Sequence, residues 1–416
     1  MPGFQRVLVT GLGPLCSLGQ ERESFWSNIA AGRSFVGPVE RLREAPVKVG
    51  AEIKHLQEAS FLGAKDKRLD RSAQFAILAS RAALLDAGLL EEKGMSPPPA
   101  RDSGGVVIGS SRGPCLLLEA YHRSYLRNPR RVNPASSPIT TPANLAGAVS
   151  RRFGLRGPSI VVSTACASGS HAIGLAFQMI RAGMADMMVA GGTEAALNPF
   201  TITMFDAAGI LSPTAGAAPS PRPFDRDRDG TVIGEGAGMI VLESERHWMG
   251  RRGGRPYCEL AGFGASSDAK SLAAVPSDGE GLSRAIRLAL RDSDLAPREI
   301  GYVNAHGTGT ITGDLAETKA IKTALGAHAY DAAVSSTKSM TGHLLGASGG
   351  IEAIVCVLAL SRGLLPPTIN LERPGEGCDL DYVAGRARPR SLKAAISSSM
   401  GFGGSNACLA FASWRA

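Results

Sequence analysis

The chain has 416 residues, of which 44% are hydrophobic and 20% charged, and its 45 basic and 37 acidic side chains give a formal net charge of +8. This composition is that of a globular protein and excludes a disordered one, and the length favours two domains or a duplicated one. The charge favours an acidic partner, but the absence of basic stripes interleaved with aromatic residues leaves nucleic acid as only one candidate.

Short β-branched runs that end in Gly or Ser alternate with helical patterns rich in Ala and Leu, which is typical of α/β folds with central sheets. The first four runs are Arg6–Gly13, Gly104–Ser111, Ser159–Ala165 and Asp186–Gly192. Four more follow in the same order, at Tyr257–Gly264, Ile300–Gly307, Ala332–Lys338 and Ala394–Gly404. The 51 glycines, about 12% of the chain against a typical ~7%, predict many tight turns and close backbone approaches.

The two sets of runs indicate an internal duplication. An amphipathic helix end precedes the second run of each set, at Ala82–Leu89 and at Leu288–Leu295. We place the boundary in the polar stretch RHWMGRRGGRP, so that residues 1–250 and 251–416 form two related halves whose strand-end loops face a shared cleft. The alternative is that such echoes occur in any α/β protein. Longer loops at Asn128–Ala143 and Pro213–Gly230 are predicted to serve function or an interface.

The cysteines and the hydropathy pattern bear on the compartment. Seven cysteines, scattered and never spaced CxxC, argue against a disulfide framework or a zinc site and favour a reducing compartment. No basic-then-apolar leader opens the chain, and the most apolar helical stretch, Ile351–Leu360, is too short to span a bilayer and contains Glu352. We therefore expect a cytoplasmic protein without a membrane partner.

Cys166 is a candidate nucleophile. It lies in the segment STACASGSHAIG, where a strand pattern stops at Ala165 and an amphipathic helix follows. This position places the sulfur near a helix N-terminus, where unpaired N–H groups and the helix dipole favour a thiolate. A lone cysteine is more often a small buried hydrophobic residue, but the strand-turn-helix context favours the nucleophile.

Polar residues also follow the strands predicted in the second half. His306 opens the loop HGTGT, and His343 lies five residues after Lys338 in SSTKSMTGHLLGASGG. Neutral imidazoles can donate N–H bonds to a developing oxyanion. A lysine can fix the tautomers of these imidazoles and set the electrostatic field around them. The glycine-rich GFGGSN, Gly401–Asn406, is either a tight turn or a loop whose backbone N–H helps to bind an oxyanion.

Two other motifs offer alternatives. Residues 109–113 fit the G-x-S-x-G pattern of an α/β-hydrolase nucleophile elbow, with Ser111 as the nucleophile. However, Pro114 follows, and the Asp and His of a triad are unplaced. The stretch GLGPLCSLG has the wrong glycine spacing for dinucleotide binding and predicts a tight turn.

Eight motifs occur in one order along the chain: TACASGSHAIG, DRDGTVIGEGAG, VNAHGTGT, GDLAE, SSTKSMTGHLLGASG, PPTINL, GCDLDYV and GFGGSN. Through them the chain resembles the elongating β-ketoacyl-acyl carrier protein synthases, the KAS I/II and type II polyketide ketosynthase group. The resemblance implies the thiolase fold, an α/β fold of five layers, αβαβα, built from two duplicated halves. It also implies an acyltransferase that condenses an acyl group held on Cys166 with malonyl-acyl carrier protein, with loss of CO2, to give β-ketoacyl-acyl carrier protein.

The resemblance implies roles for individual residues. Cys166 resembles the acylated nucleophile, and His306 and His343 resemble the pair that supports decarboxylation and stabilises the enolate. Lys338 resembles the structural and electrostatic lysine, and Glu317 its ion-pair partner. A starter-type synthase would carry Asn at position 343, and the second cysteine of a biosynthetic thiolase is missing from the GFGGSN loop, so both features favour elongation.

The resemblance also covers substrate delivery. Thr308 and Thr310 match positions that bind the phosphopantetheine arm, and Phe402 matches a gate whose backbone N–H joins that of Cys166 as the oxyanion hole. No metal or organic cofactor is implied, because 4'-phosphopantetheine is carried by the partner acyl carrier protein. The family forms dimers, so we expect a homodimer or a heterodimer with a chain-length factor, and no nucleic acid partner.

The basic charge fits an acidic acyl carrier protein. The residues that could steer it are Lys65, Lys67, Arg68, Arg71, Arg127, Arg130 and Arg131. The first four match a carrier-contact region of the family, and the alternative is a solvated helix face.

The predicted acyl pocket, formed by Arg112, Phe205, Thr231 and Met400, departs from the family pattern. Arg112 stands in a turn that is commonly small and apolar, and Thr231 and Met400 replace phenylalanines. An arginine there must snorkel, pair with an acid or meet a polar group. We therefore expect a specialised polyketide or polyene ketosynthase, with housekeeping fatty-acid elongation as the alternative and a non-catalytic chain-length-factor-like subunit less favoured.

Overall fold

The strands of the protein form one large mixed sheet and two small ones. The computed structural model describes residues 5–91, 102–130, 132–218, 220–251 and 254–414. The large sheet contains β1 (Val7–Cys16), β4 (Gly104–Gly109), β5 (Ser159–Val162), β6 (Met187–Glu194), β7 (Gly236–Ser244), β8 (Cys258–Ser267), β9 (Ile300–Asn304), β10 (Ala333–Ser335), β13 (Ala394–Gly401) and β14 (Ser405–Ala412). Two-residue strands pair as β2 (Gly37–Pro38) with β3 (Val49–Gly50), and β11 (Leu364–Leu365) with β12 (Arg388–Pro389).

Some of the helices begin at a side-chain N-cap. The helices are α1 (Arg22–Ala30), α2 (Arg71–Asp86), α3 (Cys115–Arg127), α4 (Ser136–Thr140), α5 (Asn144–Phe153), α6 (Ser168–Arg181), α7 (Pro199–Ala207), α8 (Glu245–Gly250), α9 (Glu280–Ser293), α10 (Ile311–Leu325), α11 (Lys338–Thr341) and α12 (Ser348–Arg362). Asp70 caps α2 by accepting the Ser72 N–H, and Asn198 caps α7 ahead of Pro199 at its first position.

The strand order shows the same pattern twice. The order is β10-β9-β13-β14-β8-β1-β7-β6-β4-β5, and β1 meets β8 through only two residue pairs. On each side of the β1–β8 junction three strands pair antiparallel, in the orders β1-β7-β6 and β8-β14-β13. Two further strands then pair in parallel, β4 and β5 on one side and β9 and β10 on the other. Strands β1, β4, β5 and β6 therefore correspond to β8, β9, β10 and β13, which is the correspondence that the sequence predicted.

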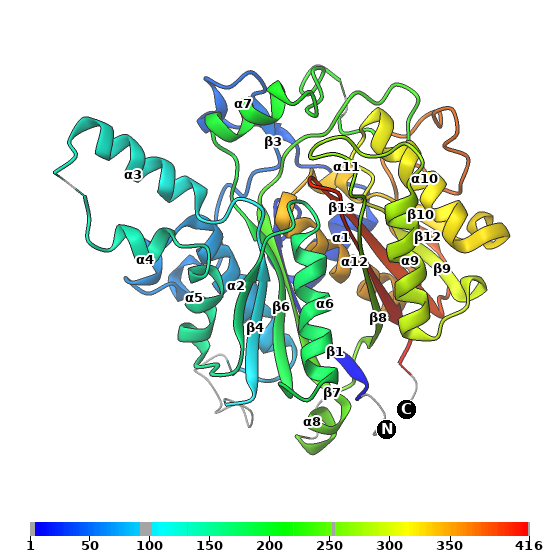
Figure 1. Cartoon of the computed structure of the whole chain (residues 1–416), viewed down its shortest axis with the longest axis horizontal. Helices are drawn as coiled ribbons and strands as arrows, with labels where there is room; N and C mark the ends of the chain where they lie inside the picture. Colours follow the sequence, from blue (N-terminus) through cyan, green and yellow to red (C-terminus); the bar gives the residue numbers. More distant parts are fainter. Residues whose placement is uncertain (1–4, 92–101, 131, 219, 252–253, 415–416) are drawn as a thin grey trace.

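The halves of the sheet stack with helices between and outside them (Figure 1). Helices α6 and α12 lie in the middle and contact strands of both halves. Helices α2 and α5 cover one outer face, and α9, which packs against β8 and β14, covers the other with α10. This arrangement is the predicted five-layered αβαβα fold, in which helix α12, buried from Ser348 to Leu360, forms the central core.

The eight runs that the sequence predicts do not include β7 or β14, although Cys408 of β14 was expected in an apolar strand. Both strands run through short or small-residue segments, GAGMIVLES and SNACLAFA, that directly follow glycine-rich turns. The glycines of β7 and of β1 serve close packing rather than turns. A Cβ at Gly13 would lie 1.9 Å from the Ala79 carbonyl oxygen of α2, and one at Gly238 would lie 2.3 Å from the Ile351 nitrogen of α12. Part of the glycine excess therefore brings helices close to the sheet.

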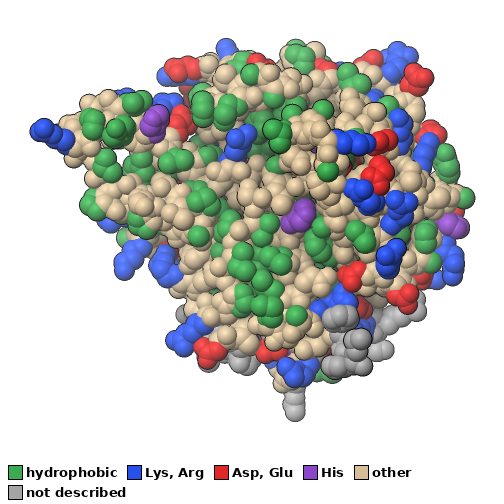
Figure 2. Space-filling view, viewed as in Figure 1, with side chains coloured by type: hydrophobic (Ala, Val, Ile, Leu, Met, Phe, Trp, Pro, Cys, Tyr) green, Lys and Arg blue, Asp and Glu red, His purple; other side chains and the backbone are tan. Residues whose placement is uncertain are grey.

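Helices α3 and α4 stand out from the body of the molecule (Figure 1). Hydrophobic side chains gather on this projection, as Figure 2 shows, and Leu118, Tyr125 and Leu126 are each about half exposed or more. The sequence predicted a loop at Asn128–Ala143 that serves function or an interface, and the structure places the short helix α4 within it. The exposed apolar side chains lie on the helix before this segment, α3.

One helical run in the described part of the chain has the length and apolar composition to cross a membrane. It covers residues 345–362, and so is longer than the stretch that the sequence singled out. Of this window, 89% is buried inside the protein. That burial is what the core helix of the five-layered fold requires.

Candidate active site

Cys166 lies in a tight turn between β5 and α6. Ala165 has a φ of 48°, which is unusual for a residue with a Cβ, and Thr164 pairs with Cys166 across the turn. The Ser168 hydroxyl donates to the Ala165 carbonyl and accepts the Thr164 N–H. These bonds fix the sulfur at the N-terminal end of α6, as the sequence predicted, and Cys166 is 9% exposed.

The protonation state of Cys166 differs from the predicted thiolate. Burial raises the pKa of the thiol to about 12, while the positive charges of Lys338 and Arg112 act to lower it and Glu194 acts to raise it. Burial disfavours the charged form more strongly than these two cations favour it. The thiol is therefore the resting form in the unliganded site, and attack requires that its proton be transferred.

His306 follows β9 and is held by its backbone. Its N–H and that of Gly307 each donate to a carboxylate oxygen of Glu317 over 2.7 Å, and the Ser398 hydroxyl donates to the same carboxylate. Burial, with help from Lys338 and His343, lowers the pKa of His306 well below its ordinary value. The imidazole is therefore neutral at physiological pH.

His343 follows α11 and is fixed on two sides. Its backbone pairs with residues 232 and 234, and its Nδ1 accepts the Leu345 N–H over 3.3 Å with the Ser348 hydroxyl 3.0 Å away. Because Nδ1 accepts, the neutral ring carries its proton on Nε2. Burial and the Lys338 charge lower the pKa of His343 well below its ordinary value.

The predicted ion pair between Lys338 and Glu317 is wrong. Lys338 is fully buried, and its ammonium pairs with Glu352 of α12 instead. Glu317 is engaged by the two N–H groups and the hydroxyl described above, so its carboxylate holds the loop of His306. The signal for Glu352 was the lone acid in the otherwise apolar stretch GIEAIVCVLAL, since a buried carboxylate needs a partner.

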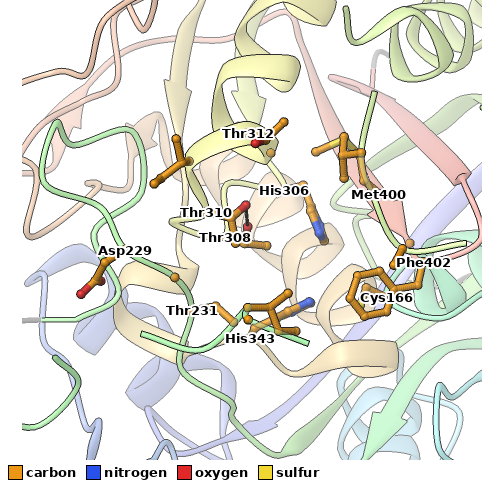
Figure 3. Close-up of a pocket in the computed structure, with 18 residues that line it drawn as sticks. Cys166, Asp229, Thr231, His306, Thr308, Thr310, Thr312, His343, Met400 and Phe402 are labelled. Atoms are coloured by element: carbon orange, nitrogen blue, oxygen red, sulfur yellow. Dashed lines mark hydrogen bonds between the residues drawn. The ribbon is translucent and has the colours of Figure 1, made fainter. Parts of the chain in front are cut away.

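The two halves of the chain bring their polar residues to one cavity of about 300 Å³. It is lined by residues that include Cys166, Thr231, His306, Thr308, Thr310, His343, Met400 and Phe402. Figure 3 shows the two imidazoles facing Cys166 and Phe402 across this cavity. The imidazole centres are 5.3 Å apart and their planes are nearly perpendicular, at 87°. Two N–H donors and a thiol thus share a space of low polarity, which strengthens their interactions with a developing charge.

The loop after β13 lies directly beside the nucleophile. A Cβ on Gly401 would lie 3.3 Å from the Cys166 nitrogen and 2.4 Å from the Thr164 carbonyl oxygen. Phe402 is half-buried and packs on the apolar cluster that contains Cys166. Farther out, the Thr308 and Thr310 hydroxyls are 3.0 Å apart at the cavity wall.

The four residues of the predicted acyl pocket do not all line this cavity. Thr231 and Met400 do, and the buried Thr231 hydroxyl has no hydrogen-bond partner among the described residues. Phe205 packs in the apolar cluster with Cys166. Arg112 lines a second cavity, of about 680 Å³, between α3 and α7.

The predicted carrier-contact residues also differ in their surroundings. Lys65, Lys67 and Arg68 are exposed on and beside a 3-10 turn at Asp66–Arg68, and Arg127 and Arg130 are exposed at the tip of the α3 projection. Arg71 is not free, because its guanidinium pairs with the buried Glu235 and donates to the Ile53 carbonyl. Arg131 lies outside the described residues.

The G-x-S-x-G segment does not form a nucleophile elbow. The Ser111 N–H donates to Glu194, and among the described residues no histidine or aspartate is hydrogen-bonded to the Ser111 hydroxyl. Helix α3 begins four residues later, at Cys115. Within the same described ranges, no cluster of three or more His, Cys, Asp or Glu side chains is placed to hold a metal ion.

A duplicated five-layered fold with a cysteine at the end of one inner helix, facing two histidines from the other half, defines an acyltransferase of the thiolase fold. Comparison with known proteins agrees. The β-ketoacyl synthase N-terminal domain model matches residues 4–247, and the C-terminal domain model matches residues 257–372. The chain belongs to the β-ketoacyl synthase family.

Relatives and solved structures cover the full length. The chain is 42% identical to a 3-oxoacyl-acyl-carrier-protein synthase 2 of Synechocystis sp. and 40% identical to one of Staphylococcus aureus, in each case over 99% of both chains. Among solved structures it is similar to a β-ketoacyl synthase from Burkholderia phymatum, with a TM-score of 0.90 at 33% identity over 99% of this chain and 100% of the other. It is also similar to the ishigamide ketosynthase/chain length factor, with a TM-score of 0.91 at 30% identity and the same coverage.

Proposed function

We propose that the enzyme condenses an acyl group held on Cys166 with malonyl-acyl carrier protein. The observation that carries this proposal is the single cavity that Cys166, His306 and His343 share. In the first step the sulfur of Cys166 bonds to the acyl carbon of a carrier thioester, the carrier C–S bond breaks, and the thiol proton passes to the departing pantetheine thiolate. One difficult step is thereby divided into two.

The second step forms the new carbon–carbon bond. The C–C bond to the carboxylate of malonyl thioester breaks, CO2 leaves, and its electron pair forms an enolate whose oxygen receives N–H bonds from His306 and His343. The enolate carbon attacks the acyl carbonyl, whose oxyanion faces the N–H groups of Cys166 and Phe402. The Cys166 C–S bond then breaks, the β-ketoacyl carrier product leaves, and the thiolate takes up a proton from water. Because decarboxylation supplies the nucleophile, no strong base is needed.

Other residues serve this reaction from outside the reacting atoms. Burial first, and the positive charge of Lys338 second, keep both imidazoles neutral, and Lys338 is itself paired with Glu352. Glu317 holds the His306 loop, and Thr308 and Thr310 bind the pantetheine arm that the carrier brings. The enzyme needs no metal or organic cofactor of its own, since the thioester is delivered on the carrier's 4'-phosphopantetheine.

The partners follow from charge and exposed surface. An acidic acyl carrier protein fits the net charge of +8 and the exposed cluster of Lys65, Lys67 and Arg68, with Arg127 and Arg130 as a second basic site. A dimer, with a second copy or with a chain-length factor, fits the unpaired edge of β5 and the apolar α3 projection. The relative of known structure that is a ketosynthase/chain length factor supports the second alternative.

The chain consists of two halves, 1–250 with the nucleophile and 251–416 with the histidines and the lysine, and it works in the cytoplasm. The narrow β1–β8 junction supports this division.

Arg112 in the acyl region favours a specialised type II polyketide or polyene pathway over housekeeping fatty-acid elongation. Efficient elongation of saturated acyl-carrier proteins of graded length would favour the housekeeping pathway instead.

Mass spectrometry tests the chemistry directly. Incubation with an acyl-carrier protein should add the acyl mass to the wild type and not to Cys166→Ala. Addition of malonyl-carrier protein should then remove that mass and yield a β-ketoacyl carrier product. If wild type and Cys166→Ala gave the same spectrum, the chain would be a non-catalytic subunit like a chain-length factor.

A further inference from the structure

Arg112 presents an unneutralised cation beside the acyl region. Its guanidinium is exposed and, among the described residues, has no ion pair or side-chain hydrogen bond. Its Cζ lies 4.8 Å from the centre of the buried Phe205 ring. This cation–π contact fixes the plane of the guanidinium on one face and leaves the N–H donors at its edge available.

The backbone of Arg112 is held rigidly. Glu194, fully buried at the end of β6, accepts the Arg112 N–H over 3.1 Å and the Ser111 N–H over 2.7 Å. The same carboxylate accepts the Gly346 N–H, which ties the turn to the segment that follows His343. Because backbone and hydroxyl donors occupy this carboxylate, it positions Arg112 without pairing with the guanidinium.

The cavity in front of Arg112 has a positive balance. It lies between α3 and α7, is about 680 Å³ in volume, and its wall includes Cys115, Leu118, His122 and Met204. The acid in this wall, Glu119, is engaged by Arg123 one helical turn away. The wall is therefore part apolar, with Leu118, Phe200 and Met204, and part polar, with His122, Asn198 and Thr201, and Arg112 is its unpaired charge. Such a lining suits a chain that is apolar along its length and anionic at its end.

Packed apolar side chains lie between this cavity and the nucleophile. Cys166, Ile202 and Phe205 belong to one buried apolar cluster, and Cys115, from the cavity wall, packs against it. Although burial raises the pKa of the Cys166 thiol, the Arg112 charge is close enough to act in the opposite direction. Phe205 stands between the two, since it packs in the cluster of Cys166 and carries Arg112 on its ring, so an acyl chain that leaves Cys166 and displaces Phe205 reaches the guanidinium.

We propose that Arg112 is a specificity-determining residue that binds the carboxylate at the far end of an α,ω-dicarboxylic acyl chain whose other end is the thioester on Cys166. This inference rests on the proposed acyl-enzyme. A carboxylate can accept two parallel N–H bonds from the guanidinium edge, whereas a methyl terminus would remove water from the cation and give nothing in return.

A matched pair of substrates tests the inference. Octanoyl and octanedioyl groups have the same length, and each is loaded on the carrier protein. The acylation of Cys166, followed by intact-protein mass spectrometry, should be roughly tenfold or more faster with octanedioyl. The octanedioyl preference should weaken as ionic strength rises, because salt screens the attraction between a carboxylate and the exposed guanidinium. Pairs of hexanoyl with hexanedioyl and decanoyl with decanedioyl define the length that spans the cavity.

Two variants separate charge from shape. Arg112→Leu should invert the preference toward octanoyl, and Arg112→Lys should keep part of the preference for octanedioyl. Arg246→Leu, an exposed arginine beside Asp186 far from the cavity, is the matched control and should behave as the wild type. The salt dependence of the wild type tests the inference even where a variant fails to fold.

The outcomes distinguish this inference from the function on which it rests. If the wild type loads octanoyl as fast as octanedioyl at every length, or if Arg112→Leu keeps the preference for octanedioyl, the inference is overturned and the acyl-enzyme stands. If no acyl chain of either kind loads Cys166, the proposed function fails and the inference fails with it.

Discussion

Lys338 is the residue on which the charge of the active site depends. Its ammonium is fully removed from solvent, beside two imidazoles whose pKa values it depresses, and Glu352 is the carboxylate paired with it. A buried ion pair contributes little net stability, because desolvation of both charges offsets their attraction. Removing one partner alone lowers the stability of the fold, since the remaining charge stays buried and unpaired.

We expect Glu352→Gln to lower the free energy of unfolding by about 3–5 kcal/mol. Chemical denaturation of the wild type and the variant measures this loss. The double variant Lys338→Met, Glu352→Leu is the control, because it removes both charges and should recover much of the stability while activity remains lost. Equal stability of Glu352→Gln and the wild type would show that Lys338 has another partner.

The histidines set the pH dependence of the reaction. Burial first, and Lys338 second, lower the pKa of His306 and His343 well below the ordinary ~6.5. A lowered pKa means that the neutral form persists to lower pH, so the rate of malonyl decarboxylation should stay flat as the pH falls from about 8 to below 6.5. Steady-state kcat, measured across this range with buffers of constant ionic strength, checks the expectation. A half-maximal rate near 6.5 would contradict it.

At the scale of the elements, the sequence predicted the order of the eight β-branched strands and their pairing into two equivalent sets. Periodicity reports burial on one or both faces of a strand, so it found runs such as Ile300–Asn304. It gave no run at β7, where glycine and alanine open the strand, and the apolar strand around Cys408 was not counted among the eight runs. The partner of Lys338 was missed for a different reason: Glu352 is fourteen residues away, and only packing of α12 against α11 brings the two charges together.

The glycines of the sheet are a second feature whose role the sequence did not predict. Composition predicted turns, but Gly238 is the third residue of strand β7, where its missing side chain lets α12 approach. We expect Gly238→Ala to lower the free energy of unfolding by about 1–3 kcal/mol or more, because its Cβ would meet the backbone of Ile351. Gly37→Ala, where a Cβ meets nothing within 4 Å, should change it by no more than about 0.5 kcal/mol. Thermal unfolding of the two variants side by side measures the difference.

The basic side chains of the molecule differ in how much they contribute to the electrostatic field around it. Many of its basic side chains are paired, as Arg71 is with Glu235, and such pairs contribute nothing to the field that an approaching partner meets. Lys65, Lys67 and Arg68 are exposed and, in the described part of the chain, without an ion pair. Charges of this kind act on the rate of encounter with an acidic protein more than on the chemistry that follows.

We expect the triple charge reversal Lys65→Glu, Lys67→Glu and Arg68→Glu to raise the KM for malonyl-acyl carrier protein roughly tenfold or more at low salt, with kcat nearly unchanged. Raising the ionic strength should weaken binding of the wild type and narrow the gap between the two proteins, because exposed charges are screened. Arg246→Glu, exposed beside Asp186, reverses one charge outside the cluster and is the control for the single reversal Lys67→Glu, which changes the net charge by the same amount; it should leave KM close to that of the wild type. An unchanged KM in the triple variant would move carrier docking to the projection of Arg127 and Arg130, whereas a matching loss in the control would show that net charge alone attracts the carrier.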